Sequence, residues 1–309
     1  MSTRAPSGGP ARMYNMPRHI QHEKRDGGRM IKLHLQTLSY RDTVKSGERG
    51  LLGMIDLAAD LGFDGIDFED RQFVSTEPDY LEAVRLHALK RGLNTGYIGV
   101  IGAFGQGQHG SDEGHFRHAC RWIDVCAQMQ VPLLRLIGGK TPDGQTDEQA
   151  WPWLAGWMRR VTDYARAKRV LVGLHNHNHG MFPATGPQVV RMLDEVADPY
   201  FTHILDTGQY RGSPGASGGT KGRADPAHDL YAYIRQTAPR AVAVRAKVYR
   251  IRSGEEEWID YRRVLPALKA ARFNGLLSVV FEGWDDMDER EALPKAARFF
   301  RRLLAEYEM

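Results

Sequence analysis

Short apolar runs alternate with amphipathic helical stretches eight times between Met30 and the C-terminus of this 309-residue chain. This alternation constrains the fold most, because strands separated by helices pair in parallel within one sheet. Eight such units in about 280 residues match the number and size of an α/β protein built as a single (β/α)8 TIM barrel. A doubly wound parallel sheet has the same alternation and remains the alternative. The predicted strands are Ile31–Leu38, Gly65–Phe68, Thr95–Val100, Leu133–Ile137, Val170–Leu174, Phe201–Leu205, Val242–Val248 and Leu276–Phe281. The predicted helices are Leu51–Leu61, Tyr80–Leu89, Phe116–Met129, Trp151–Ala167, Gln188–Val196, Leu230–Gln236, Tyr261–Ala271 and Leu293–Tyr307.

The sequence divides into a tail and one domain. Residues 1–29 are rich in Gly, Pro, Arg and His and lack an apolar period, so we expect a disordered N-terminal tail. Residues 30–309 would form the barrel. Within them, Leu57–Asp70 and Leu268–Gly283 repeat one pattern of helix, Phe-Asp-Gly or Phe-Asn-Gly turn, and strand.

Composition and charge argue against several classes of partner. The formal net charge of +4 comes from dispersed Arg and Lys residues, whereas nucleic-acid readers concentrate their charge on one face. No apolar run approaches the ~20 residues of a membrane span, and the N-terminus lacks the apolar core of a secretory signal. Cys120 and Cys126 fall in one predicted helix about 9 Å apart, too far to bridge. A reducing, cytoplasmic location is therefore expected.

Polar residues collect where the predicted strands end, which in a barrel is the side that carries the active site. A charged side chain inside an apolar strand is costly to bury unless it is paired. Arg245 and Lys247 are therefore expected to face acids such as Asp206 and Glu282, and a purely structural ion-pair network is the alternative for these four. The strand-end residues are His34, Gln36, Asp67, Glu69, Arg135, His175, His177, Asp206, Gln209, Arg245, Lys247 and Glu282.

A histidine-rich segment follows the fifth predicted strand, in the run VLVGLHNHNHG of Val170–Gly180. Side chains two apart on a strand share a face, so His175, His177 and His179 could point at one spot together with Asp206. Three imidazoles and a carboxylate would form a metal or acid–base cluster. A solvated His/Asn loop is the alternative interpretation.

A glycine-rich segment, Gly105–Gly110, formally matches the GxGxxG pattern of dinucleotide-binding loops. That fingerprint requires an acid ending the next strand, whereas the acid about 20 residues on, Asp124, lies within a predicted helix. We therefore interpret the segment as a flexible loop over the barrel mouth and expect no nucleotide cofactor. His109 in this loop would face solvent, or would reach a substrate.

Six stretches resemble the xylose isomerase-like TIM-barrel superfamily of sugar isomerases and epimerases. The resemblance runs from about Met30 to the C-terminus. It is carried by Leu57–Asp70, Leu133–Lys140, Val170–Gly180, His203–Tyr210, Val242–Tyr249 and Gly275–Asp286.

The resemblance implies a ligand set at four strand ends. In that superfamily a Glu, an Asp, a His and a Glu, on strands five to eight, usually hold a divalent metal. These positions fall on His175, Asp206, Arg245 and Val280, so only the Asp is retained. The resemblance is thus compatible with a rearranged Mn, Zn or Mg site that uses His175 and Asp206, joined by His177 and Glu282, or with Arg245 in place of the metal. Gln209 stands where the superfamily usually has a His, whereas two more superfamily residues, Lys247 and Glu282, are kept.

By resemblance, the expected activity belongs to the isomerase or epimerase class, with a lyase as second choice. A sugar or polyol would lose a proton next to its carbonyl and form an enediolate. Glu282 or His177 would be the base, and Arg245 and Lys247 the oxyanion stabilisers. Carbohydrate-binding residues would be His34, Asp67, Arg135 and Gln209. Three alternatives remain: a non-catalytic sugar-binding or structural barrel subunit, a metal-free dehydratase, and least of all an endonuclease at abasic DNA sites. The chain could also form a homo-oligomer.

Overall fold

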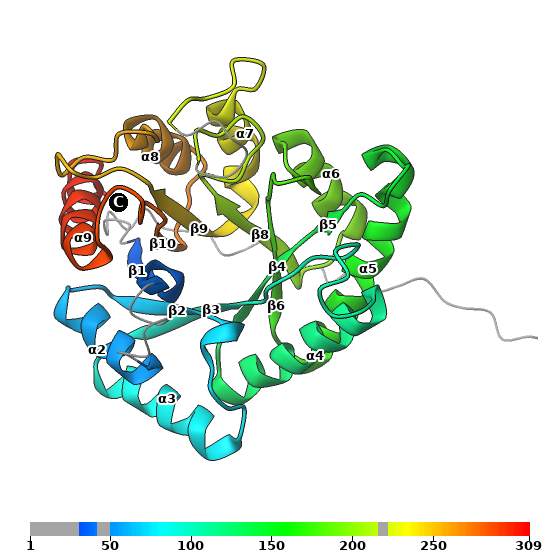
Figure 1. The fold of residues 1–309 in the computed structure, drawn as a ribbon, viewed down its shortest axis with the longest axis horizontal. Helices are drawn as coiled ribbons and strands as arrows, with labels where there is room; N and C mark the ends of the chain where they lie inside the picture. Colours follow the sequence, from blue (N-terminus) through cyan, green and yellow to red (C-terminus); the bar gives the residue numbers. More distant parts are fainter. Residues whose placement is uncertain (1–30, 42–49, 216–221) are drawn as a thin grey trace, which may run out of the picture.

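Eight parallel strands close into a barrel, in the order β1-β10-β9-β8-β6-β4-β3-β2 (Figure 1). This computed structural model describes residues 31–41, 50–215 and 222–309. The closed strand order confirms the single (β/α)8 barrel and excludes the doubly wound sheet. Each strand end lies within two residues of its predicted position. The strands are β1 Lys32–Gln36, β2 Gly65–Glu69, β3 Asn94–Gly99, β4 Leu133–Ile137, β6 Leu171–His175, β8 Phe201–Asp206, β9 Ala241–Val248 and β10 Leu276–Phe281.

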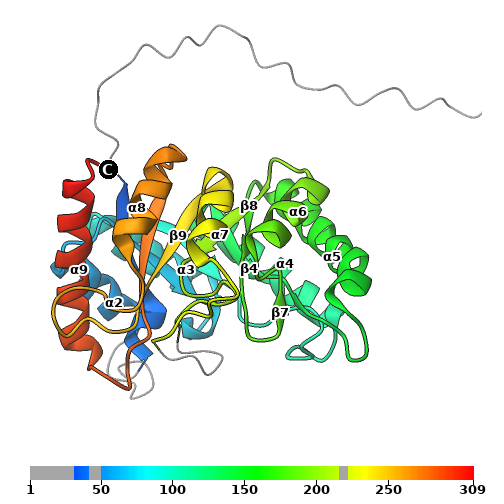
Figure 2. The ribbon, with the colours of Figure 1, turned by 90° about the horizontal axis from the view of Figure 1, so that it is seen from above.

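Helices form a layer around the outside of the barrel (Figures 1 and 2). They are α2 Leu51–Asp60, α3 Pro78–Lys90, α4 Asp112–Met129, α5 Asp147–Lys168, α6 Gly186–Val196, α7 Leu230–Thr237, α8 Tyr261–Ala270 and α9 Glu289–Glu306. Three short 3-10 helices are described: η1 Thr37–Tyr40, η2 Asp70–Gln72 and η3 Ala238–Arg240. Two further strands of two residues each, β5 Gly139–Lys140 and β7 Met181–Phe182, pair with each other.

Three helices begin about one turn earlier than their apolar pattern predicts. The side chains of Ser111, Thr146 and Asp288 accept hydrogen bonds from backbone N–H groups in the first turns of α4, α5 and α9. Thr146 and Gln149 form a reciprocal capping box. An apolar pattern begins at the first apolar residue of a helix, so it does not include polar first turns of this kind.

The strands carry apolar side chains outward and polar side chains inward. On β9, Val244, Ala246 and Val248 belong to the main apolar core beneath the helices, whereas Arg245 and Lys247 are inward-facing and buried. An apolar plug fills the barrel interior on the N-terminal side of these charges and consists of Tyr97, Leu133, Ile204 and Ala243. Three of its members lie two residues before an inward-facing charged residue on the same strand. The charges are thereby confined to the C-terminal half of the barrel.

Some sequence-based expectations concern termini and thiols. The tail predicted for residues 1–29 lies outside the described residues. Cys120 and Cys126 both lie on α4 as free thiols, which confirms that they do not bridge each other. Across the described ranges, no helix is both long enough and apolar enough to cross a bilayer.

Candidate functional site

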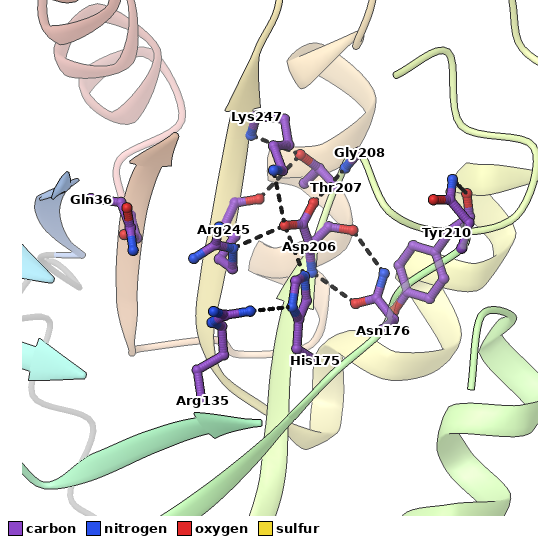
Figure 3. Close-up of polar contacts among 12 residues, drawn as sticks. Gln36, Arg135, His175, Asn176, Asp206, Thr207, Gly208, Tyr210, Arg245 and Lys247 are labelled. Atoms are coloured by element: carbon purple, nitrogen blue, oxygen red, sulfur yellow. Dashed lines mark hydrogen bonds and ion pairs between the residues drawn. The ribbon is translucent and has the colours of Figure 1, made fainter. Parts of the chain in front are cut away.

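Five side chains from five strands form a closed ring of polar contacts across the barrel interior, which we call the charged ring. Arg135 on β4 donates from Nη2 to Glu69 Oε2 on β2 at 2.8 Å, and from Nη1 to His175 Nδ1 on β6 at 2.9 Å. His175 Nε2 lies 3.0 Å from Asp206 Oδ2 on β8. Arg245 on β9 donates from Nε to the same oxygen at 3.0 Å, and its Nη1 lies 3.5 Å from Glu69 Oε1. Figure 3 shows Arg135, His175, Asp206 and Arg245 of this ring.

The charged ring fixes the protonation state of its histidine. A guanidinium can only donate, so Nδ1 of His175 must accept from Arg135 and its Nε2 must carry the proton that is donated to Asp206. Burial lowers the pKa of His175 well below its usual value, which agrees with a neutral imidazole. Burial alone would raise the pKa of Asp206, but the positive charge of Lys247 and the hydrogen bond from His175 hold it well below its usual value. Asp206 is therefore a carboxylate at all physiological pH values.

A second ion pair lies on the solvent side of the charged ring. Lys247 Nζ is 2.5 Å from Glu282 Oε1 and 3.6 Å from Asp206 Oδ2. The side chain of Glu282 is 16% exposed, whereas that of Lys247 is 2% exposed. The predicted pairing of Arg245 and Lys247 with Asp206 and Glu282 is confirmed. Glu282 is the most accessible carboxylate of this cluster.

A third group continues the network toward the apolar plug. His34 Nδ1 lies 3.2 Å from Asp67 Oδ1, which also accepts the backbone N–H of Tyr97 at 3.1 Å. The Tyr97 hydroxyl accepts from Arg245 Nη1 at 2.8 Å and lies 3.2 Å from Ser278 Oγ. Sequence reasoning missed Tyr97 and Ser278. The alternation of strand faces could have identified both as inward-facing, because each lies two residues from another inward-facing position on its own strand.

The histidine run does not converge as predicted. The rings of His175 and His177 are 5.3 Å apart and nearly perpendicular, and those of His177 and His179 are 4.8 Å apart. Of the three, His175 alone is hydrogen-bonded to Asp206. The chain leaves the strand at His175 because the Asn176 side chain exchanges two hydrogen bonds with the backbone of Asp206, at 2.9 and 2.8 Å. The strand-face argument for a three-histidine cluster is therefore wrong.

His177 nevertheless lies next to the charged ring. Burial lowers its pKa to about 3, so this imidazole is neutral at pH 7. Its buried Nδ1 has no hydrogen-bond partner within the described ranges. Gln209, which follows β8, is also buried, and its backbone N–H lies 3.4 Å from the Asp206 carbonyl oxygen.

The glycine-rich loop folds onto α4. His109 stacks on His118 with ring centroids 4.0 Å apart and on His115 at 5.2 Å, and its Nε2 lies 3.1 Å from the Ile101 carbonyl oxygen. Gly105 and Gly110 have φ values of 75° and 80°, a conformation that glycine adopts without strain. His109 is therefore held against the helix while it remains partly exposed, and its contact with a substrate stays a prediction.

Gly99 leaves room for the charged ring. A Cβ atom at this position would lie 2.6 Å from Arg135 Nε and Nη2 and 2.9 Å from Glu69 Oε1. We expect Gly99→Ala to lower the free energy of unfolding by about 1–3 kcal/mol, because overpacking would push the two charges apart. Urea denaturation measures this. Gly156→Ala is the control, because its Cβ on α5 meets nothing within 4 Å and should raise stability by about 0.5–1 kcal/mol. If Gly99→Ala has a free energy of unfolding as high as that of Gly156→Ala, the expectation is contradicted.

The residues present do not fit the divalent metal that the resemblance implies. His175 has no free nitrogen lone pair, because one nitrogen accepts from Arg135 and the other carries a proton. Arg245 and Val280 supply no metal ligand at all. Among the residues that the structure describes, no group of three or more His, Cys, Asp or Glu side chains could hold a metal ion.

Comparisons with known proteins agree with the fold. An L-ribulose 3-epimerase is 18% identical with a TM-score of 0.67, over 90% of this chain and 96% of that one. A D-psicose 3-epimerase with D-tagatose, from Clostridium cellulolyticum H10, is 15% identical with a TM-score of 0.67, over 88% and 99%. An apo 3-keto-D-glucoside 4-epimerase from E. coli is 12% identical with a TM-score of 0.66, over 88% and 100%. No curated protein matches the sequence significantly. The family model described as Xylose isomerase-like TIM barrel matches residues 55–303, and the chain therefore belongs to that family.

Proposed function

We propose that this protein is a sugar or polyol isomerase or epimerase that abstracts a proton from the carbon next to a carbonyl. The Lys247–Glu282 pair carries the proposal, because it places a partly exposed carboxylate beside an ammonium group at the C-terminal edge of the barrel. A base and an electrophile side by side are what this chemistry needs. Sugar epimerases among the solved relatives support the same substrate class.

The proposed step begins with the carboxylate of Glu282. It takes the proton, the electrons of the broken C–H bond form a carbon–carbon double bond, and the carbonyl oxygen becomes an oxyanion. Lys247 donates a hydrogen bond to that oxygen, and the positive charge of Arg245 lies behind it. Asp206 orients both cations and stays ionised. Return of a proton to the opposite face of the same carbon gives an epimer. Its delivery to the former carbonyl carbon, with the neighbouring hydroxyl proton passing to the oxyanion, gives an isomer. Loss of a leaving group from the adjacent carbon instead gives elimination.

The other candidate residues take supporting roles in this proposal. A pKa of about 3 makes His177 a weak base, so its free Nδ1 is assigned to a hydrogen bond with a substrate hydroxyl. Gln209 remains a proposed carbohydrate-binding residue. Three others, His34, Asp67 and Arg135, are at most 3% exposed, so we assign them to holding the charged ring in place.

Deuterium exchange tests the proposal. Ketoses and aldoses incubated with the protein in D2O should gain deuterium at the carbon next to the carbonyl, as seen by NMR. Glu282→Gln should slow this exchange at least about 100-fold, because the general base is lost. Glu255→Gln is the matched control, because that carboxylate pairs with Arg302 and Arg262 at the surface. Unchanged exchange in Glu282→Gln would exclude Glu282 as the base. If none of the sugars gains deuterium, the proposed function is wrong.

A non-catalytic sugar-binding barrel is the second candidate. The charged ring favours it, because the two guanidinium groups and the two carboxylates are paired with one another and are at most 3% exposed. Calorimetric binding of a sugar without deuterium exchange or product formation would select this candidate.

A further inference from the structure

We propose that the site works without a divalent metal and that the Arg245 guanidinium is its resident positive charge. The proposal deepens the proposed function, and only the second of the two experiments below rests on that function.

Donors surround the carboxylate of Asp206. Its Oδ2 faces three N–H groups: Arg245 Nε at 3.0 Å, His175 Nε2 at 3.0 Å and Lys247 Nζ at 3.6 Å. Its Oδ1 accepts the backbone N–H of Gly208 at 2.9 Å. A metal ion approaching Oδ2 would have to displace a charge-assisted hydrogen bond and would lie beside three cationic or N–H donor groups.

Arg245 occupies the space between the two buried carboxylates of the charged ring. Its Nε contacts Asp206, and its Nη1 contacts Glu69 and the Tyr97 hydroxyl. The side chain is 2% exposed, so solvent screens its charge weakly. A dication placed between the same carboxylates would meet this guanidinium as a like charge.

The members of the charged ring hold one another in place, so a metal ion could not replace one contact alone. Each member contacts two others, so turning one side chain toward a metal breaks two contacts. The apolar plug lies on one side, and the Lys247–Glu282 pair lies on the other. A guanidinium held this way provides a fixed positive charge below the ammonium group of Lys247. This is the electrostatic element that oxyanion chemistry requires.

Metal binding provides the first test. Protein without a histidine tag is dialysed against Mn²⁺, Zn²⁺ or Mg²⁺, and bound metal is measured by mass spectrometry. We expect well below one equivalent per chain. One equivalent that disappears in Asp206→Asn would overturn the proposal, and His175→Gln answers the same question if Asp206→Asn fails to fold. Metal that persists in both variants binds elsewhere and leaves the proposal standing.

Chelation provides the second test. Deuterium exchange into sugar should be unchanged after exhaustive dialysis against EDTA. Loss of exchange that added metal restores would overturn the proposal. If no sugar exchanges at all, the proposed function fails, but the metal measurement still decides whether Arg245 takes the place of the ion.

Discussion

Replacing Arg245 by alanine is expected to lower the free energy of unfolding by about 3–5 kcal/mol. The substitution removes the cation that contacts both Asp206 at 3.0 Å and Glu69 at 3.5 Å. It leaves two buried carboxylates with less compensation and the Tyr97 hydroxyl without its donor. Equilibrium urea denaturation at neutral pH measures the loss.

Arg240→Ala is the matched control for this experiment. Arg240 pairs with Asp194 at 2.6 Å, but both side chains are largely exposed, so the expected cost is about 0.5 kcal/mol. Arg245→Lys should fall between the two, because an ammonium keeps the charge but cannot reach Asp206 and Glu69 together. If Arg245→Ala costs no more than Arg240→Ala, the charged ring does not stabilise the fold.

The ion pairs between neighbouring strands can be predicted from the sequence, because side chains on a strand alternate regularly between its two faces. Residues two apart on a strand share a face, and neighbouring strands of a barrel end together, so the pairs Arg245–Asp206 and Lys247–Glu282 are predictable. Closure of the ring through Glu69 is not. Contact between β9 and β2 crosses the barrel, and it depends on side-chain length, strand tilt and the gap left by Gly99.

Two features of the loops after the strands have local physical causes that the sequence pattern does not show. Extending the strand-face rule beyond His175 assumed an extended backbone, but the Asn176 side chain binds the backbone of Asp206 and ends the strand there. The stacking of His109 on His118 could not be predicted either, because a periodic pattern does not report ring contacts made by a loop. Both outcomes depend on single side-chain contacts that a pattern of polarity does not encode.

Acid should destabilise the protein steeply, by about 4 kcal/mol per pH unit near pH 5.5, because several buried histidines are neutral in the folded state. Burial lowers the pKa of His115 and of His203 to about 4 and that of His177 to about 3, and it lowers the pKa of His175 well below its usual value. In the unfolded chain all four regain a pKa near 6.5. The stability that depends on these four neutral imidazoles is therefore fully present above about pH 6.5, and it is lost as the pH falls toward 4.

One buried carboxyl group works in the opposite direction. Burial raises the pKa of Glu256 to about 7, although it accepts backbone N–H groups of Tyr249, Arg250, Trp258 and Ile259. Between pH 7 and the usual Glu pKa of 4.5, the folded state binds this proton before the unfolded state does. Stability from Glu256 therefore rises as the pH falls, and it offsets about one of the four histidine protons. The net uptake on unfolding is about three protons, which gives the slope stated above.

His115 is the residue with which to test this slope. Its ring is buried against Phe104 with centroids 4.7 Å apart, and neither ring nitrogen has a hydrogen-bond partner in the part of the chain that the structure describes. His115→Phe should keep the packing and remove one titrating group, so the slope should fall by about 1.4 kcal/mol per pH unit. Stability at pH 7 should not fall, because two unpaired polar atoms are removed. Urea denaturation of both proteins at several pH values measures the two slopes. Equal slopes would mean that His115 is already protonated in the folded state.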